Sequence, residues 1–170
     1  LTLNLKHPDG QRIIKDLINQ ADVLVENFRP GKMDDYRLGY RHLAPKFPRL
    51  VYCSVSGFGH SGPRRDNPGY DAVMQAEGGL MSITGPADGV GYRLGVAITD
   101  ITSGMFAAYG VAIALLARHR TGLGQFVDIG MLDSAAALLT YQAGIYFASG
   151  KAPKRIGNLH PTIAPYETLE

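Results

Sequence analysis

The chain has 170 residues, of which 45% are hydrophobic and 19% are charged, and its formal net charge is +2. This composition is typical of a soluble globular protein with a sizeable core. The small net charge and the absence of a Lys/Arg stripe exclude a nucleic-acid-binding surface. Cys53, the single cysteine, excludes a disulfide framework. It lies in an apolar run, so we expect a buried thiol and a reducing cytoplasm.

The first thirty residues follow a strand-helix-strand pattern. Residues 1–5 alternate like a strand, Pro8 opens a helix with apolar residues at helical spacing, and residues 22–28 form a second strand that stops before Pro30. This spacing predicts a βαβ unit, which belongs to a parallel sheet. Because residue 1 already lies inside a strand pattern, we expect the chain to be part of a longer protein.

The remaining elements alternate in the same way. They are a strand over 50–55, a Gly/Pro-rich loop over 57–69, a helix over 70–80, and two apolar helices over 100–118 and 132–149 that bracket a strand over 126–130. This alternation predicts the α/β fold class. The Pro and Lys residues after Gly150 indicate a linker. We therefore assign residues 1–150 to an α/β domain and 151–170 to the start of the linker.

One apolar segment, residues 101–117, resembles a membrane span. Seventeen residues is close to the minimum length for crossing a bilayer, and Thr102, Ser103, Gly104 and Gly110 dilute the apolar run. Strand patterns flank the segment on both sides. We therefore expect a helix buried in protein and no membrane contact.

Residues 57–62 (GFGHSG) match the dinucleotide-binding pattern G-x-G-x-x-G after a predicted strand. That motif must open a helix whose first N–H groups receive the pyrophosphate. Here Pro63 and Pro68 follow, so no helix is expected. The glycines more readily allow the loop to pass close to a ligand or to another part of the backbone.

Asn27, Phe28, Ser56, Gly57 and Asp133 follow the carboxyl ends of predicted strands, where α/β proteins bind ligands. Asp133 also begins an apolar helix, where the positive end of the helix dipole favours a charged carboxylate. An aspartate at such a junction can be a helix cap or a nucleophile. Position alone leaves both alternatives open.

A series of segments resembles the class III CoA-transferases, a family that includes the formyl-CoA:oxalate and carnitine CoA-transferases. The series runs through almost the whole chain: DVLVENFRPG (22–31), GFG with GP (57–63), PGYD (68–71), RLGV with Asp100 and Gly104 (93–104), RTGLGQ (120–125) and VDIGMLD (127–133). The closing residues GNLHP and PY (157–166) resemble the branch that moves CoA between dicarboxylic acids, often from succinyl-CoA.

The resemblance implies the large, Rossmann-like domain of a two-domain protein, with a parallel sheet and flanking helices, in which two chains form an interlocked homodimer. It implies that coenzyme A is bound as an acyl-CoA substrate and that the second substrate is a carboxylic acid. It places the nucleophile at Asp133, whose carboxylate would form a mixed anhydride and then an aspartyl-CoA thioester.

The family's binding residues also match positions of this chain. They are Leu3, Lys6, Asn27, Phe28, Arg29, Arg37, Tyr70 and Asp71. Lys6, Arg29 and Arg37 are candidates for the phosphates of CoA. Tyr70 and Asp71 match a tyrosine-acid pair near the acyl group, with an Asp cap as the alternative. Arg93 and Asp100 recur in the family, and we expect a structural ion pair or cap there.

Two other functions remain open. The α-methylacyl-CoA racemases share the fold, but they need two acid/base groups and carry a His-Asp pair where this chain has Tyr70 and Asp71. A tyrosine with a pKa near 10 replaces imidazole poorly at neutral pH. The chain could also bind CoA without turnover. The five histidines lack ligand spacing, so no metal is expected.

Overall fold

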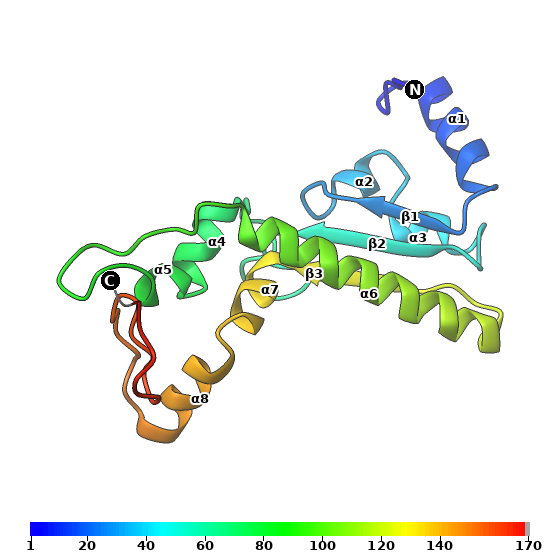
Figure 1. Ribbon diagram of the computed structural model, residues 1–170. Helices are drawn as coiled ribbons and strands as arrows, with labels where there is room; N and C mark the ends of the chain where they lie inside the picture. Colours follow the sequence, from blue (N-terminus) through cyan, green and yellow to red (C-terminus); the bar gives the residue numbers. More distant parts are fainter. Residues whose placement is uncertain (169–170) are drawn as a thin grey trace.

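The computed structural model describes residues 1–168 and centres on three strands in one sheet (Figure 1). These are β1 (Val23–Glu26), β2 (Val51–Ser56) and β3 (Phe126–Gly130). The order is β1-β2-β3 and both pairings are parallel, with Cys53 opposite Val25 and Val127. Parallel strands place their carboxyl ends at one edge, so the residues that follow them are brought together there.

The middle strand supplies the core. All residues of β2 except Val55 are buried, and the thiol of Cys53 is among them, as predicted. A parallel strand covered on both faces reads as a continuous apolar run, which is the pattern of this segment. The ring of Tyr52 packs against those of Tyr40 and Phe126, at centroid distances of 6.0 and 5.7 Å.

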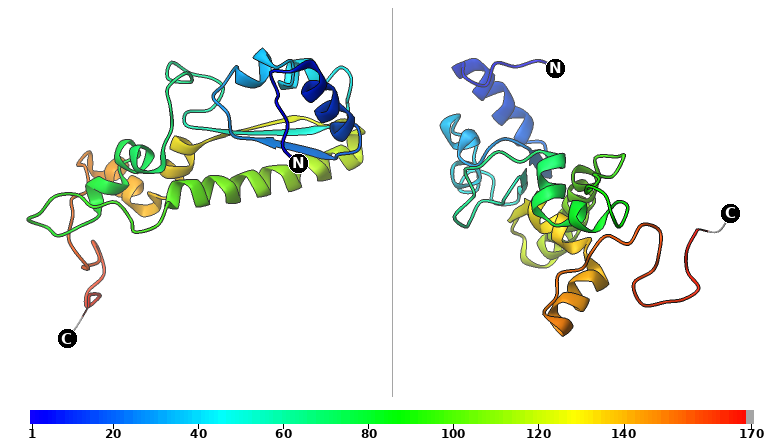
Figure 2. Two further views of the ribbon diagram at one scale, coloured as in Figure 1. Left: turned by 90° about the horizontal axis from the view of Figure 1, so that it is seen from above. Right: turned by 90° about the vertical axis from the view of Figure 1, so that its left-hand side faces the viewer.

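Helices cover both faces of the sheet. The helices of the described residues are α1 (Pro8–Ile18), α2 (Lys32–Asp35), α3 (Tyr40–Leu43), α4 (Asp71–Glu77), α5 (Leu80–Ile83), α6 (Ile98–Thr121), α7 (Met131–Ala137) and α8 (Thr140–Ser149), of which α4, α5 and α8 lie beyond the end of the sheet (Figure 1). Figure 2 shows α6 along one side of the sheet, with α1, α2 and α3 on the other. The predicted α/β class with a parallel sheet is confirmed.

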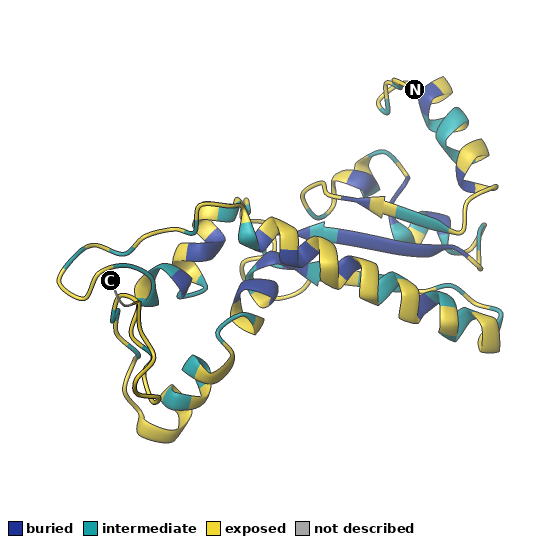
Figure 3. Cartoon of the chain, in the orientation of Figure 1, coloured by how far each residue is buried: buried dark blue, intermediate teal, exposed yellow. Residues whose placement is uncertain are grey.

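The 24-residue helix α6 is long and apolar enough to cross a membrane by length and composition alone. It instead packs along β2, β3 and α7, and near its end Arg118 donates hydrogen bonds to the Asp22 carboxylate at 2.7 Å and to the Arg49 carbonyl at 2.8 Å. Its outer face is largely exposed (Figure 3), so the prediction of a helix buried in protein holds for the inner face only.

The predicted strand over residues 1–5 is wrong, and with it the first half of the βαβ unit. The segment turns back instead: the His7 N–H donates to the Asn4 carbonyl at 3.0 Å, and the His7 ring caps α1 by accepting from the Asp9 N–H at 3.2 Å. An alternating pattern allows one face of a strand to be buried, but a strand also needs a neighbouring strand that pairs with its backbone N–H and C=O groups. Within the described residues, this segment has none.

Two predicted helices are each interrupted. The helix over 70–80 divides into α4 and α5 at Gly79, whose φ is +86°. The helix over 132–149 divides into α7 and α8 before Thr140, whose φ is +43°. A left-handed residue ends a helix without disturbing the apolar pattern. Residues 151–168 contain no helix or strand, and the division into domain and linker stays a prediction.

Candidate functional site

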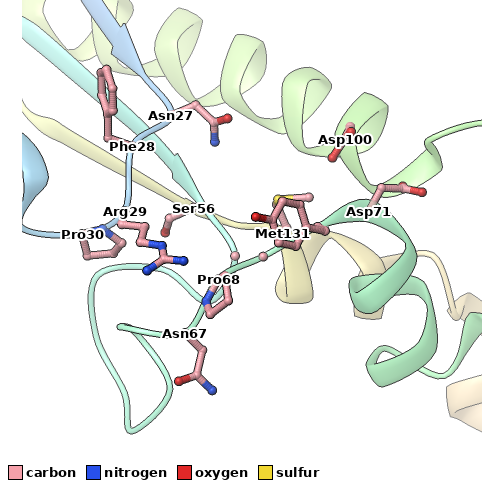
Figure 4. A pocket seen from close by; sticks show the side chains of 13 residues that line it. Asn27, Phe28, Arg29, Pro30, Ser56, Asn67, Pro68, Asp71, Asp100 and Met131 are labelled. Carbon is pink, nitrogen blue, oxygen red and sulfur yellow. The ribbon is translucent and has the colours of Figure 1, made fainter.

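A cavity of about 340 Å³ opens beyond the carboxyl ends of the strands (Figure 4). Three segments line it, namely the turn after β1, the loop after β2, and the first turns of the helices beyond. The lining residues are Asn27, Phe28, Arg29, Pro30, Ser56, Gly57, Asn67, Pro68, Gly69, Tyr70, Asp71, Asp100 and Met131. Five of the predicted binding residues, Asn27, Phe28, Arg29, Tyr70 and Asp71, therefore meet at one place.

The turn after β1 is held by two hydrogen bonds. The Asn27 amide donates to the Val55 carbonyl on β2 at 2.6 Å, and the Phe28 N–H donates to the buried carboxylate of Glu26 at 2.7 Å. These bonds leave the Phe28 ring 43% exposed beside the cavity. An exposed aromatic ring on a backbone held in this way is suited to stacking on a planar ligand.

The loop over residues 57–69 returns to its own start. A Cβ atom on Gly69 would lie 2.2 Å from the Gly57 Cα, so only glycine permits this approach of two backbone segments. The Gly57 carbonyl also accepts a hydrogen bond from the Leu132 N–H at the start of α7, at 3.0 Å. As predicted, the G-x-G-x-x-G match opens no helix, and its glycines serve a close backbone contact.

Asp71 caps the start of α6 from a neighbouring helix. Its carboxylate accepts hydrogen bonds from the Thr99 N–H at 2.9 Å, the Thr99 hydroxyl at 2.7 Å and the Gln75 amide at 2.7 Å. Burial opposes the charged form, but the hydrogen bonds outweigh it and lower the pKa of Asp71 below its ordinary value. The capping alternative therefore describes what the Asp71 carboxylate does in this chain.

We expect Asp71→Ala to reduce the free energy of unfolding at pH 7 by about 1–2 kcal/mol, because it removes a helix cap and leaves donors unpaired. A lowered pKa in the folded state stabilises above the ordinary carboxyl pKa of 3.8, and this contribution is lost as the pH falls through the folded-state value. The difference between variant and wild type, measured by urea unfolding, should therefore shrink below about pH 4. Asp88→Ala, at an exposed position, is the control; an equal loss there would contradict the cap.

Asp100 is the other carboxylate in the cavity and the third residue of α6. Burial, reinforced by the negative charge of Asp71, raises the pKa of Asp100. Within residues 1–168, no side-chain or backbone group donates a hydrogen bond to its carboxylate. The expected ion pair with Arg93 is absent there as well, and the Arg93 guanidinium donates to the Leu94 carbonyl at 3.1 Å. Asp100 therefore presents a carboxylate without a structural partner.

Asp133 lines a different recess. It is the third residue of α7 and lines an apolar hollow of about 400 Å³ between α6 and the end of β3, together with Phe106, Tyr109 and Ile113. The structure does not bring Asp133 into the cavity that holds the other predicted binding residues. Its role as the nucleophile stays a prediction.

Three further predicted residues also lie outside the cavity. Leu3 and Lys6 belong to the turn before α1, and Arg37 is an exposed residue with φ of +55° between α2 and α3. Their contacts with CoA stay predictions. Within residues 1–168 no cluster of three His, Cys, Asp or Glu side chains could hold a metal ion, and the expectation of a metal-free reaction is likewise untested.

Two residues that line the cavity were not predicted as site residues. From the sequence, Asp100 was expected to have a structural role, and Ser56 was noted only for its position at a strand end. Asp100 carries the signal used for Asp133, an acid in the first turn of an apolar helix, and its helix is the longer of the two. What separates the two aspartates is which recess each helix start faces, and only the packing of α6 against α4 and α7 decides this.

Comparisons with known proteins show which family the chain belongs to. The chain is 44% identical over 170 residues to the succinyl-CoA:glutarate CoA-transferase of Mus musculus, and 44% identical over 171 residues to the acetyl-CoA:oxalate CoA-transferase of Acetobacter aceti. The matches cover 100% of this chain but only 39% and 44% of those proteins. The chain thus spans about two fifths of their length.

Solved structures give the same result. A CAIB/BAIF family protein from Brucella suis superposes with a TM-score of 0.95 at 43% identity, covering 100% of this chain and 45% of that one. A hypothetical protein from Mycobacterium tuberculosis gives 0.81 at 31% identity, covering 86% and 43%. The family model for CoA-transferase family III matches residues 1–170. The chain belongs to CoA-transferase family III.

Proposed function

We propose that the protein transfers CoA from an acyl-CoA donor to a carboxylic acid through an acylated aspartate. The observation that supports this most directly is the polarity of the cavity. The Arg29 guanidinium lies at one end and the carboxylates of Asp71 and Asp100 lie at the other (Figure 4). A ligand with phosphates at one end and a thioester at the other fits this distribution of charge.

In the proposed reaction the aspartate carboxylate attacks the thioester carbonyl carbon, and the carbon-sulfur bond breaks to release CoA thiolate and leave a mixed anhydride. The thiolate then attacks the aspartyl carbonyl, which releases the donor as a carboxylate and forms the aspartyl-CoA thioester. The acceptor carboxylate and the released thiolate repeat these two steps in reverse. The acceptor leaves as its CoA thioester, and the aspartate is regenerated without net proton transfer.

Asp133 is the proposed nucleophile, as the family resemblance implies. It lies in the first turn of α7, and its carboxylate lies beside Gly130 at the carboxyl end of β3, where Gly130 pairs with Ser56 of the cavity wall. Asp71 is occupied as the cap of α6. Asp100 lines the cavity and its carboxylate accepts no hydrogen bond within residues 1–168, so Asp100 is the alternative, to be separated from Asp133 by substitution.

Binding of the nucleotide part of CoA is proposed for the turn after β1. The exposed ring of Phe28 can stack on adenine, and the Arg29 guanidinium can pair with phosphate oxygens. Binding energy from this remote part of the substrate can hold the thioester against the carboxylate in a strained geometry. The substrates proposed are succinyl-CoA and a dicarboxylic acid, because the mouse relative carries that activity in its name.

The racemase alternative lacks its second acid/base group. Among the described residues that line the cavity there is no histidine, and the Asp71 carboxylate is held by three hydrogen bonds. Tyr70 remains, 67% exposed at the rim. A phenol is a weak acid/base group at neutral pH. CoA transfer needs one free carboxylate and no second acid/base group.

The test uses full-length protein with succinyl-CoA and a panel of dicarboxylates. Transfer predicts new acyl-CoA products and, by intact-mass spectrometry, a covalent adduct that disappears when the acceptor is added. Exchange of the α-proton with solvent, without acyl exchange, would favour the racemase. Binding of CoA with neither adduct nor exchange would show a binding module.

Homodimer formation and a cytoplasmic location belong to the same proposal. We expect residues 1–170 alone to show no turnover, because the chain spans about two fifths of the curated relatives and the proposed interlocked partner is absent. The measurement is acyl-CoA exchange by the purified chain beside the full-length protein at equal concentration. Full turnover by the chain alone would refute the requirement for the rest of the protein.

A further inference from the structure

Gly130, the last residue of β3, determines how closely the Asp133 carboxylate approaches the loop after β2. Its φ of −86° and ψ of 128° are open to any residue, so its backbone conformation does not require glycine. Its surroundings do: a Cβ atom there would lie 2.5 Å from Oδ2 of Asp133 and 3.4 Å from the backbone nitrogen of Gly59. The absence of a side chain therefore allows these two groups, from different segments, to lie against the same small space.

The N–H of Gly59 is free. Gly59 is buried, and its N–H donates no hydrogen bond within residues 1–168. Buried backbone N–H groups without a partner are rare, because each has lost its contact with water. The next N–H along the chain, that of His60, is paired with the Asp128 carboxylate at 2.9 Å. The Asp133 carboxylate accepts no hydrogen bond from the described residues. A free donor and a free acceptor thus lie side by side in the unliganded protein.

The loop holds the Gly59 N–H in a fixed position. The hydrogen bond from His60 to Asp128 ties the loop to β3, and the His60 ring is hydrogen-bonded to the hydroxyl of Ser54 at 2.7 Å. Ser54 and Asp128 are paired in the sheet, so both bonds attach the loop to neighbouring strands. Gly59 itself has a φ of +76°, which favours glycine. A donor fixed in this way needs no rearrangement during a reaction.

The proposed reaction places negative charge beside this donor. When CoA thiolate attacks the aspartyl carbonyl carbon of the mixed anhydride, a carbon–sulfur bond forms and the C=O electron pair moves onto the Asp133 oxygen. Collapse of this tetrahedral oxyanion re-forms the C=O bond and breaks the bond to the donor acid, which leaves as a carboxylate. No proton is transferred. A hydrogen bond from a fixed N–H stabilises the oxyanion more than it stabilises the neutral carbonyl of the anhydride.

We propose that the backbone N–H of Gly59 donates a hydrogen bond to the oxyanion that forms on the Asp133 carboxyl group, and that Asp128 is a positioning residue that holds this donor in place. The inference rests on the proposed function with Asp133 as the nucleophile. It gives the glycine-rich loop a catalytic role in addition to its place in the cavity wall.

The first test removes this N–H alone from the full-length protein. Glycolic acid at position 59, introduced by nonsense suppression in cell-free translation, replaces the N–H by an ester oxygen. We expect the aspartyl-CoA thioester to form from succinyl-CoA on the order of 10²-fold more slowly, the effect of one oxyanion donor, as followed by intact-mass spectrometry. The dissociation constant of CoA and the melting temperature should be unchanged, because the N–H has no partner in the free protein.

Glycolic acid at position 62 is the matched control. Gly62 lies in the same loop with a φ of +87°, is exposed, and donates no backbone hydrogen bond among the described residues. The ester there should form the thioester at the wild-type rate. An undiminished rate with the ester at position 59 would overturn this inference alone, as would an equal loss at position 62. Absence of any adduct in the wild-type protein would overturn the proposed function as well.

The second test examines the positioning role of Asp128 by ordinary substitution. Asp128→Ala removes the acceptor of the His60 N–H, whereas Asp128→Asn keeps a carbonyl oxygen that can accept from it. We expect kcat to fall by about 10- to 100-fold in Asp128→Ala, with little change in the KM for succinyl-CoA, and to recover in Asp128→Asn. Equal losses in the two variants, or a loss confined to KM, would overturn the positioning role.

Discussion

Asp133→Asn is expected to lower the rate of CoA transfer in the full-length protein by on the order of 10³-fold or more, while CoA still binds. An amide is a much poorer nucleophile than a carboxylate, whereas the contacts proposed for CoA lie at the turn after β1, at Phe28 and Arg29. The measurement is turnover together with intact-mass detection of the covalent adduct, which should vanish. The dissociation constant of CoA, measured separately, should change little.

Asp100→Asn is the matched control, because it places the same substitution at the same position of another helix start. With Asp133 as nucleophile, this variant keeps its adduct and most of its rate. The reverse pattern, with transfer abolished in Asp100→Asn and retained in Asp133→Asn, would move the nucleophile to the start of α6. Undiminished transfer in both variants would reject the aspartyl mechanism itself.

The control substitution also has a predicted effect on stability. The raised pKa of Asp100 means that its charge is disfavoured in the folded protein. A group of this kind favours folding below its ordinary pKa of 3.8, and the contribution is lost as the pH rises. At neutral pH, Asp100→Asn should therefore be as stable as wild type or more stable, as measured by urea unfolding. A clear loss of stability would contradict the raised pKa.

Gly69→Ala is expected to produce the second large effect, a loss of about 1–3 kcal/mol in the free energy of unfolding together with weaker CoA binding. The added methyl would lie 2.2 Å from the Gly57 Cα, and both contacting groups are backbone, so neither can move aside alone. The loop must then separate from the end of β2. Because this loop forms one wall of the cavity, the affinity for CoA should fall with stability.

The control for this prediction is Gly95→Ala, at an exposed glycine whose added methyl would meet nothing within 4 Å. It should change the midpoint of urea unfolding little and leave CoA affinity intact. Equal stability of Gly69→Ala and Gly95→Ala would show that the close approach of Gly57 and Gly69 does not constrain the loop.

The sequence alone was sufficient for the main architecture. The apolar run of β2 and the alternation of elements predicted an α/β fold with a parallel sheet. A strand buried on both faces has a continuous apolar sequence, and a helix with one buried face has apolar residues at helical spacing, so both can be recognised from the sequence. The sequence also predicted which residues meet at one edge of the sheet. Residues such as Asn27 and Tyr70 follow strands or open helices, and parallel strands bring their ends to one edge.

Only the tertiary structure decided how the acidic residues are used. Asp71, Asp100 and Asp133 each lie in the first turn of a helix, so local sequence gives all three the same signal. Their difference comes from packing: Asp71 caps α6, Asp100 faces the cavity, and Asp133 faces an apolar recess. Hydrogen-bond partners and the direction in which a helix start points depend on contacts between segments far apart in the chain. Those contacts cannot be predicted from the local sequence around each aspartate.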